Sequence, residues 1–197
     1  MIALLRWLTF AAFLFMPLVY FKGGITLYKD IRLSIKSTGS YRSAMLLILM
    51  SVVGLFLIGG QLVVCLDYAQ AFVWAEKVWV VTIGTFLTLL SILATFWFRF
   101  VYLGRFWSGS VQVQSSQEII EVGPYRVVRH PIYSTALVMY AGIALGFATG
   151  WIWFACGLLI IGYVLLAGYE DRFLMNNLRG YREYQERTRY RLIPWMW

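Results

Sequence analysis

One short stretch, GPYRVVRHPIY at residues 123–133, combines several side chains that could do chemistry. It holds the only histidine of the chain, His130, with two arginines, two tyrosines and two of the four prolines. A proline at the first helical position loses no hydrogen bond, so His130-Pro131 predicts a helix start, and the preceding Gly-Pro predicts a turn. A helix N-terminus beside cationic side chains favours an anionic ligand. Two plainer interpretations stay open, namely arginines that only anchor the chain at a membrane and a histidine that only caps the helix.

A second candidate element is the acidic pair Glu170-Asp171, which begins 40 residues after His130. Two apolar runs lie between them, Ser134–Thr149 and Trp151–Ala167, and Gly150 is nearly all that separates the runs. The distance along the chain is 17 residues from Tyr133 to Gly150 and 20 residues from Gly150 to Glu170. At about 1.5 Å per residue, both arms of this predicted helical hairpin therefore return to a similar depth. The histidine and the acids are therefore expected to face each other. Acids at a helix C-terminus oppose the helix macrodipole, so a salt bridge or a cationic ligand is expected to compensate them.

The composition excludes a soluble domain. Hydrophobic residues make up 61% and charged residues 13% of the 197 residues, against about 25% charged in soluble domains. The mean hydropathy is +0.72. These values predict an all-α polytopic membrane protein, in which the net charge of +8 reflects topology and not nucleic-acid binding. Cys65 and Cys156 lie in apolar runs without metal-ligand spacing, so we expect neither a metal site nor a disulfide.

Five apolar runs are expected to cross the membrane as helices: Ile2–Phe21, Ala44–Leu66, Val78–Phe98 and the two hairpin arms. Lysine and arginine alternate between the connecting segments, with five in 22–42, one in 67–77, four in 99–133, none at the hairpin turn and six in 169–197. This alternation predicts an amino terminus outside and a carboxyl terminus in the cytoplasm of a cell-membrane protein. Arg6 is expected to reach from the first helix to the interface.

The chain is expected to form one integral membrane domain over residues 1–197. Residues 1–98 supply three helices, and residues 99–197 form a cofactor-binding half with the hairpin at 134–168. Gly142, Gly146 and Gly150 recur every four residues, a spacing that lets membrane helices approach closely. The tail from Tyr169 to Tyr190 has helical apolar periodicity, which predicts an amphipathic helix at the cytoplasmic interface that closes a pocket. Docking of this helix onto a loop domain stays open as an alternative.

Six motifs occur in a characteristic order: LGRFWS at 103–108, GPYR at 123–126, RHPIY at 129–133, EDRFL at 170–174, GYREY at 180–184 and RLIP at 191–194. In this combination the chain resembles the isoprenylcysteine carboxyl methyltransferase family of integral membrane enzymes, in particular its prokaryotic members. The resemblance covers about half of the chain. It departs from the family at Ser134, where a small residue such as glycine is usual, and at Asp171, where a second glutamate is usual.

The resemblance implies an S-adenosylmethionine pocket, with S-adenosylhomocysteine as the product. The residues it implicates in cofactor binding are Gln112, Glu118, Ile119, Ile120, Tyr125, Arg129, His130, Pro131, Ile132, Tyr133 and Glu170. Among catalytic roles, Arg99 is the nearest match to the family's arginine for the substrate carboxylate. Glu170 and His130 are the obvious candidates for a base.

The resulting hypothesis is a methyltransferase that acts on a lipophilic acceptor from the bilayer, with a carboxylate of the prenylcysteine type preferred. Three alternatives stay open: an amino-phospholipid N-methyltransferase, an NADPH-dependent sterol reductase, and a membrane transporter or scaffold. The spanning runs hold almost no ionisable residues near their centres, which disfavours a coupled transporter.

Overall fold

The computed structural model describes residues 1–20, 25–39, 41–66, 77–114 and 117–196, with the backbone alone for 16–20 and 25–28. Within these ranges the protein is all-helical, with an isolated β-bridge between Val128 and Tyr190. The elements in chain order are α1 (Ile2–Tyr20), α2 (Ile25–Thr38), α3 (Tyr41–Cys65), α4 (Val78–Trp97), the π-helical η2 (Phe98–Leu103), the 3₁₀ turns η3 (Gly104–Phe106) and η4 (Gly123–Arg126), α5 (Pro131–Phe147), α6 (Gly150–Asn177) and α7 (Tyr181–Arg187).

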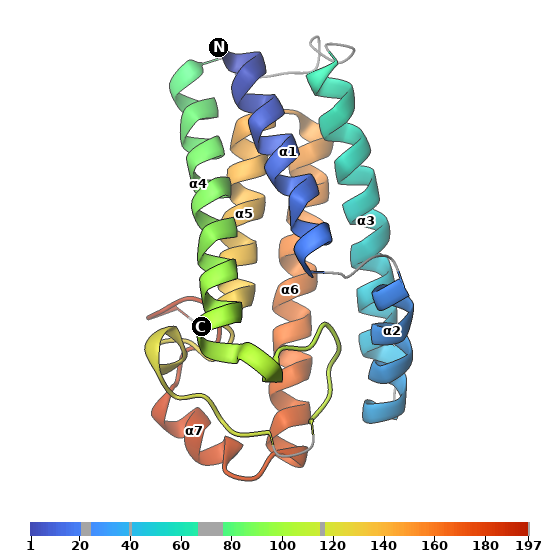
Figure 1. The fold of residues 1–197 in the computed structure, drawn as a ribbon, viewed down its shortest axis with the longest axis vertical. Helices are drawn as coiled ribbons and strands as arrows, with labels where there is room; N and C mark the ends of the chain where they lie inside the picture. Colours follow the sequence, from blue (N-terminus) through green and yellow to red (C-terminus); the bar gives the residue numbers. More distant parts are fainter. Residues whose placement is uncertain (21–24, 40, 67–76, 115–116, 197) are drawn as a thin grey trace.

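The long helices α1, α3, α4, α5 and α6 run side by side along the long axis, and α2 and α7 lie at one end of this bundle (Figure 1). The interior is packed with apolar side chains such as Leu57, Ile143 and Phe147, all fully buried. Large apolar side chains also cover the outside; Leu55 and Phe86 are more than half exposed. An exterior of this kind is stable in lipid and not in water.

Among the described residues, three helical segments are long and apolar enough to cross a membrane: Tyr41–Cys65, Val78–Phe106 and Gly150–Asn177. Ile2–Phe15 and Pro131–Phe147 are apolar but shorter. The chain is therefore a membrane protein. Residues 67–76, and with them nearly all of the connection that was expected to carry one lysine, lie outside the described residues.

The hairpin forms as the sequence predicts, although its outer ends extend beyond the predicted runs and its turn lies before Gly150, which is the first residue of α6. Helix α5 begins at Pro131, and α6 continues through Glu170 to Asn177. The turn between them is Ala148-Thr149, with Ala148 in the left-handed region at a φ of 45°.

The segment 22–42 is not the connecting loop that its charge suggested. Residues 25–38 form α2, because Ile31 and Ile35 lie one turn apart and are half-buried against the bundle while the lysines and arginine are exposed. Ser34 is fully buried, and its hydroxyl lies 2.6 Å from that of Ser43 on α3.

Gly142 on α5 and Gly84 on α4 permit close packing of the two helices. An added Cβ at Gly142 would lie 2.7 Å from the Thr88 hydroxyl oxygen, whereas one at Gly146 would meet no described atom within 4 Å. A Cβ atom at Gly84 would lie 2.5 Å from the backbone nitrogen of Gly146 and 2.6 Å from the carbonyl oxygen of Gly142. Arg6 does not reach the interface as expected. Its side chain is 2% exposed and its Nε donates to the carbonyl of Gly146 at 3.3 Å, near the C-terminus of α5, where a cation is favoured.

Candidate functional site

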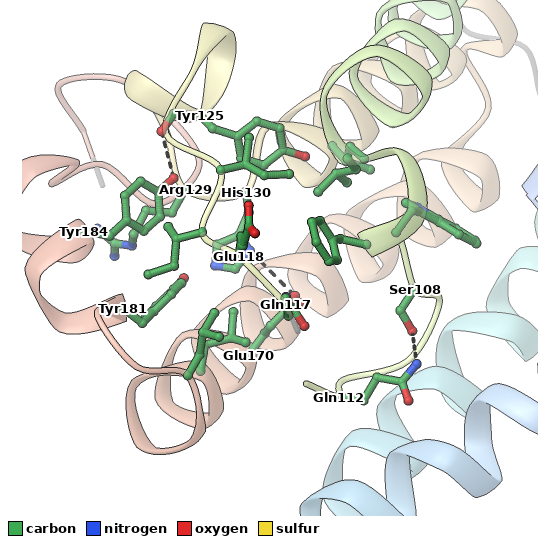
Figure 2. A pocket seen from close by; sticks show the side chains of 18 of the residues that line it. Ser108, Gln112, Gln117, Glu118, Tyr125, Arg129, His130, Glu170, Tyr181 and Tyr184 are labelled. Atoms are coloured by element: carbon green, nitrogen blue, oxygen red, sulfur yellow. Dashed lines mark hydrogen bonds and ion pairs between the residues drawn. The ribbon is translucent and has the colours of Figure 1, made fainter. Parts of the chain in front are cut away.

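A pocket lies at the end of the bundle where α4 and α6 end and α5 begins (Figure 2). Its wall is built from segments far apart in the sequence, and the residues that line it are Leu103, Phe106, Trp107, Ser108, Ser110, Gln112, Gln117, Glu118, Ile119, Ile120, Tyr125, Arg129, His130, Ile132, Tyr133, Glu170, Leu174, Leu178, Tyr181 and Tyr184. The lining is mainly aromatic and aliphatic, with two carboxylates, two amides and several hydroxyl groups.

The hairpin geometry brings the histidine to the acidic pair. His130 precedes the first residue of α5, but its side chain makes no cap hydrogen bond to the helix. Its Nε2 instead lies 2.8 Å from Oδ1 of Asp171, and its Nδ1 lies 3.6 Å from Oε2 of Glu170. Because an ionised carboxylate can only accept hydrogen bonds, Nε2 is the protonated ring nitrogen and donates a hydrogen bond to Asp171.

Asp171 is the centre of a buried network. Its side chain is 1% exposed and accepts hydrogen bonds from four side chains, those of Arg129, His130, Tyr181 and Arg191. Arg129 also donates through its second terminal nitrogen to the carbonyls of Thr188 and Arg189, both at 2.7 Å. The buried acid is thus compensated by two cations, as its burial requires. The expected place of the acids at a helix C-terminus is wrong, because α6 continues to Asn177.

The C-terminal tail is part of this network. The backbone N–H groups of Arg129 and His130 donate to the carbonyls of Tyr190 and Arg191, each at 3.0 Å. The Ser134 hydroxyl donates to the carbonyl of Leu192 at 2.6 Å. The serine that departs from the family pattern therefore ties the first turn of α5 to the tail.

Glu170 has a different environment from its neighbour. Its side chain is 23% exposed and lines the pocket. One oxygen accepts a hydrogen bond of 2.7 Å from the Tyr133 hydroxyl, whose ring stacks on that of His130 with centroids 5.4 Å apart. Glu170 therefore presents a fixed carboxylate to the pocket.

The wall opposite α6 is an extended segment held by its own side chains. Gln112 donates to the Ser108 hydroxyl at 2.7 Å, and Gln114 donates to the carbonyl of Phe106 at 3.2 Å. The segment ends at Gly123, where φ is +57° and an added Cβ would lie 2.3 Å from the Tyr102 ring. Only glycine fits this turn, as the Gly-Pro pair predicts.

Two tyrosines of α7 complete the pocket wall. The Tyr184 hydroxyl donates to the carbonyl of Tyr125 at 2.8 Å, which joins α7 to η4. Burial, followed by the nearby Asp171 carboxylate, raises the pKa of Tyr181 well above its ordinary value. The Tyr181 hydroxyl therefore stays protonated and able to donate to Asp171.

The chain is similar to a known protein family. Residues 78–179 match the phospholipid methyltransferase family, and this range includes most of the pocket wall. The chain belongs to this family. The family is part of the isoprenylcysteine carboxyl methyltransferase-like group of membrane methyltransferases, so the chain is a membrane methyltransferase. A search of curated proteins gave no match.

The structure gathers most of the residues that the resemblance implicated. Those that line the pocket are Gln112, Glu118, Ile119, Ile120, Tyr125, Arg129, His130, Ile132, Tyr133 and Glu170. Pro131 is buried beside them as the first residue of α5. Arg99 does not line the pocket. Its guanidinium carbon lies 3.9 Å from the ring centroid of Trp107, which does line the pocket.

Several lining residues were absent from the sequence-based set. They are Leu103, Phe106, Trp107, Ser108, Ser110, Gln117, Leu174, Leu178, Tyr181 and Tyr184. The sequence does hold signals for some of them, since Leu103–Ser108 and Gly180–Tyr184 are among the six ordered motifs. Gln117 and Ser110 carry no such signal, because their approach depends on the path of an extended segment.

Proposed function

We propose that this membrane methyltransferase transfers a methyl group from S-adenosylmethionine to a lipophilic acceptor that enters from the bilayer. The observation that carries the proposal is the Glu170 carboxylate, held by Tyr133 and beside His130, in an aromatic pocket at one end of an apolar bundle. A soluble acceptor would not require a pocket in this position.

The lining residues fit the chemical groups of the cofactor. Glu170 and Glu118 would accept hydrogen bonds from the ribose diol or the amino group. The aromatic walls, which include Trp107 and Tyr125, suit a sulfonium cation and a flat adenine. When bound, the cofactor supplies an activated methyl group for an in-line displacement.

Positioning is then the main task of the protein in this reaction. We assign Arg129 a positioning role, because its guanidinium is engaged by Asp171 and two tail carbonyls. We assign His130 the same kind of role toward Glu170. Helix α7, with Tyr181 and Tyr184 in the wall, would close the pocket at its outer end.

For the acceptor, a carboxylate of the prenylcysteine type is our first candidate. A carboxylate attacks without losing a proton, so it needs no general base. Arg99, stacked on Trp107 beside the pocket, is the candidate partner for that carboxylate.

An amino-phospholipid is the second candidate, favoured by the charges of the lining. Glu118 and Glu170 are carboxylates, and the lining cation Arg129 is already paired. An ammonium headgroup would be attracted to these carboxylates, and an amine acceptor would require one of them or His130 to take its proton. The name of the matching family points the same way.

The proposed topology has five membrane helices, α1, α3, α4, α5 and α6, with the amino terminus outside and the pocket at the cytoplasmic face. It is supported by the arrangement of these helices in one bundle and by the lysine and arginine counts (Figure 1).

The direct test is isothermal titration of the purified protein with S-adenosylhomocysteine and, separately, with NADPH. Binding of the first ligand alone supports the proposal, binding of NADPH alone would make the protein a reductase, and binding of neither would favour a transporter or scaffold. Glu170→Gln should weaken S-adenosylhomocysteine binding about tenfold to a hundredfold, as expected for a lost hydrogen bond to a charged group. Glu121→Gln is the matched control, because Glu121 lies outside the lining and pairs with Arg187 on the surface.

The acceptor is identified by the chemistry of the product. Membranes are incubated with the enzyme and methyl-labelled cofactor, and the labelled lipid fraction is treated with alkali. Label released by alkali as volatile methanol indicates a methyl ester and a carboxylate acceptor. Label that stays non-volatile, even on a headgroup that alkali has freed of its acyl chains, indicates an N-methyl group and an amino-phospholipid.

A further inference from the structure

Helix α2 presents three cations on one face. Lys29, Arg32 and Lys36 are spaced three and four residues apart, so they lie along one side of the helix, and all three are exposed. Among the residues that the structure describes, none of these three forms an ion pair. Leu33, 41% exposed, lies beside them. A helix with exposed cations and an apolar neighbour suits the headgroup region of a membrane.

A neighbouring side of α2 touches the wall of the pocket. The Ser37 hydroxyl donates to the carbonyl of Val111, a residue that is 2% exposed. About two turns earlier, Asp30 lies against Gly109, where an added Cβ would be 2.5 Å from Oδ2 of the carboxylate. Gly109 and Val111 alternate with Ser108, Ser110 and Gln112, which line the pocket.

The segment 108–112 is therefore held between the pocket and α2. It has no regular secondary structure, so these contacts and the bond between Gln112 and Ser108 restrain it. In Figure 2, Ser108 and Gln112 lie at the side of the pocket that is next to the blue and cyan ribbons of the first part of the chain. A force that fixes α2 would also fix this part of the wall.

We propose that α2 binds anionic phospholipid headgroups through Lys29, Arg32 and Lys36, and that bound headgroups stabilise the 108–112 wall of the pocket through Ser37 and Asp30. The end of the bundle where α2 lies is the end that carries the pocket (Figure 1). Each cation near an anionic membrane surface adds about a fivefold gain in association. The inference depends on the contacts of α2 and on the membrane location, and it holds whichever methyl acceptor the pocket takes.

The test uses the full chain in lipid nanodiscs of phosphatidylcholine alone or of phosphatidylcholine mixed with phosphatidylglycerol. Hydrogen–deuterium exchange is measured for α2 and for residues 107–114, and retention of each lipid is measured by native mass spectrometry. We expect phosphatidylglycerol to be retained preferentially and to slow exchange in both segments. Equal retention and equal exchange in the two lipid mixtures would overturn the proposal. Neither readout requires the cofactor, so a failed cofactor titration leaves this test intact.

Variants separate binding from coupling. Replacing Lys29, Arg32 and Lys36 together by glutamine should lower the preference for phosphatidylglycerol at least tenfold and abolish the slowing in both segments. The control replaces Arg179, Arg182 and Arg189 by glutamine, which removes the same charge from exposed positions of the tail and should lower the preference less. Equal losses in the two triple variants would mean a general charge effect and overturn a site on α2.

Two further variants keep the result interpretable. The double variant Lys29→Arg with Lys36→Arg conserves the charge and should keep the wild-type preference for phosphatidylglycerol. Ser37→Ala should keep the slowing in α2 and lose it in residues 107–114; slowing that persists in both would overturn the coupling. Inorganic phosphate added to phosphatidylcholine nanodiscs should have no effect, and an effect equal to that of phosphatidylglycerol would identify a free-anion site instead.

Discussion

Glu170 and Asp171 are consecutive residues, but successive side chains on an α-helix point about 100° apart. Glu170 consequently faces the pocket, and Asp171 points into the packed junction of α5, α6 and the tail. The sequence marks the pair as one unit, and which of two adjacent acids faces inward depends on packing that the sequence alone does not specify. The departure from glutamate at Asp171 also becomes intelligible, because a short carboxylate fits between Arg129 and Arg191.

Asp171→Asn should destabilise the protein strongly. The substitution leaves Arg129 and Arg191 buried or half-buried without their counter-charge, and breaking a buried ion pair costs about 3–5 kcal/mol. Thermal unfolding in detergent measures the effect. Glu121→Gln removes a surface pair with Arg187 and should change stability by less than about 1 kcal/mol. Similar losses for the two variants would contradict the central place of Asp171.

At the scale of elements, the close approach of α4 and α5 depends on glycine. Gly84→Ala should lower stability by about 1–3 kcal/mol, because its Cβ would overlap the backbone of α5 and force the helices apart. Gly59→Ala is the matched control, since no described atom lies within 4 Å of its added Cβ. The control should be neutral or slightly stabilising, as alanine favours helices over glycine. A neutral Gly84 variant would mean that the two helices separate at little cost.

The tail should be divisible at Leu192. Residues 190–192 accept hydrogen bonds from the start of α5, supply Arg191 to Asp171, and bury Leu192 to 1% exposure. Truncation after Leu192 keeps these contacts and should leave stability and S-adenosylhomocysteine binding near wild type. Truncation after Arg189 removes them and should weaken both. Equal behaviour of the two truncations would show that residues 190–192 do not support the pocket.

The hairpin was predictable because helix length is set by a constant rise per residue, and so was the meeting of His130 with the acids. The tail segment that pairs with residues 128–130 was not, because its contacts are backbone hydrogen bonds with no side-chain pattern. Helix α2 was not predicted as a helix, because its charged residues obscured the short apolar stripe of Ile31 and Ile35. Arg6 was misplaced because a partner 140 residues away, the Gly146 carbonyl, is invisible to local reasoning.

For the whole molecule, the bundle separates two ends that should lie on opposite sides of the membrane. Lys77 begins α4 at one end, and Glu186 on α7 lies at the other, with the pocket; both are exposed. The lysine and arginine counts assign the α7 end to the cytoplasm.

Substituted-cysteine labelling tests this assignment in intact cells. Cys65 and Cys156 are buried and can first be replaced by alanine to give an unreactive background. A membrane-impermeant maleimide should then label Lys77→Cys in intact cells and Glu186→Cys only after the membrane is opened. Lys29→Cys on α2 should behave like Glu186→Cys, because both lie at the end with the pocket (Figure 1). If positions 29 and 186 were labelled from opposite sides of the membrane, the five-helix topology would be ruled out. Helix α2 could then not lie on the membrane face that holds the pocket, whose wall it contacts. Labelling of position 186 alone in intact cells would invert the orientation and place the site outside.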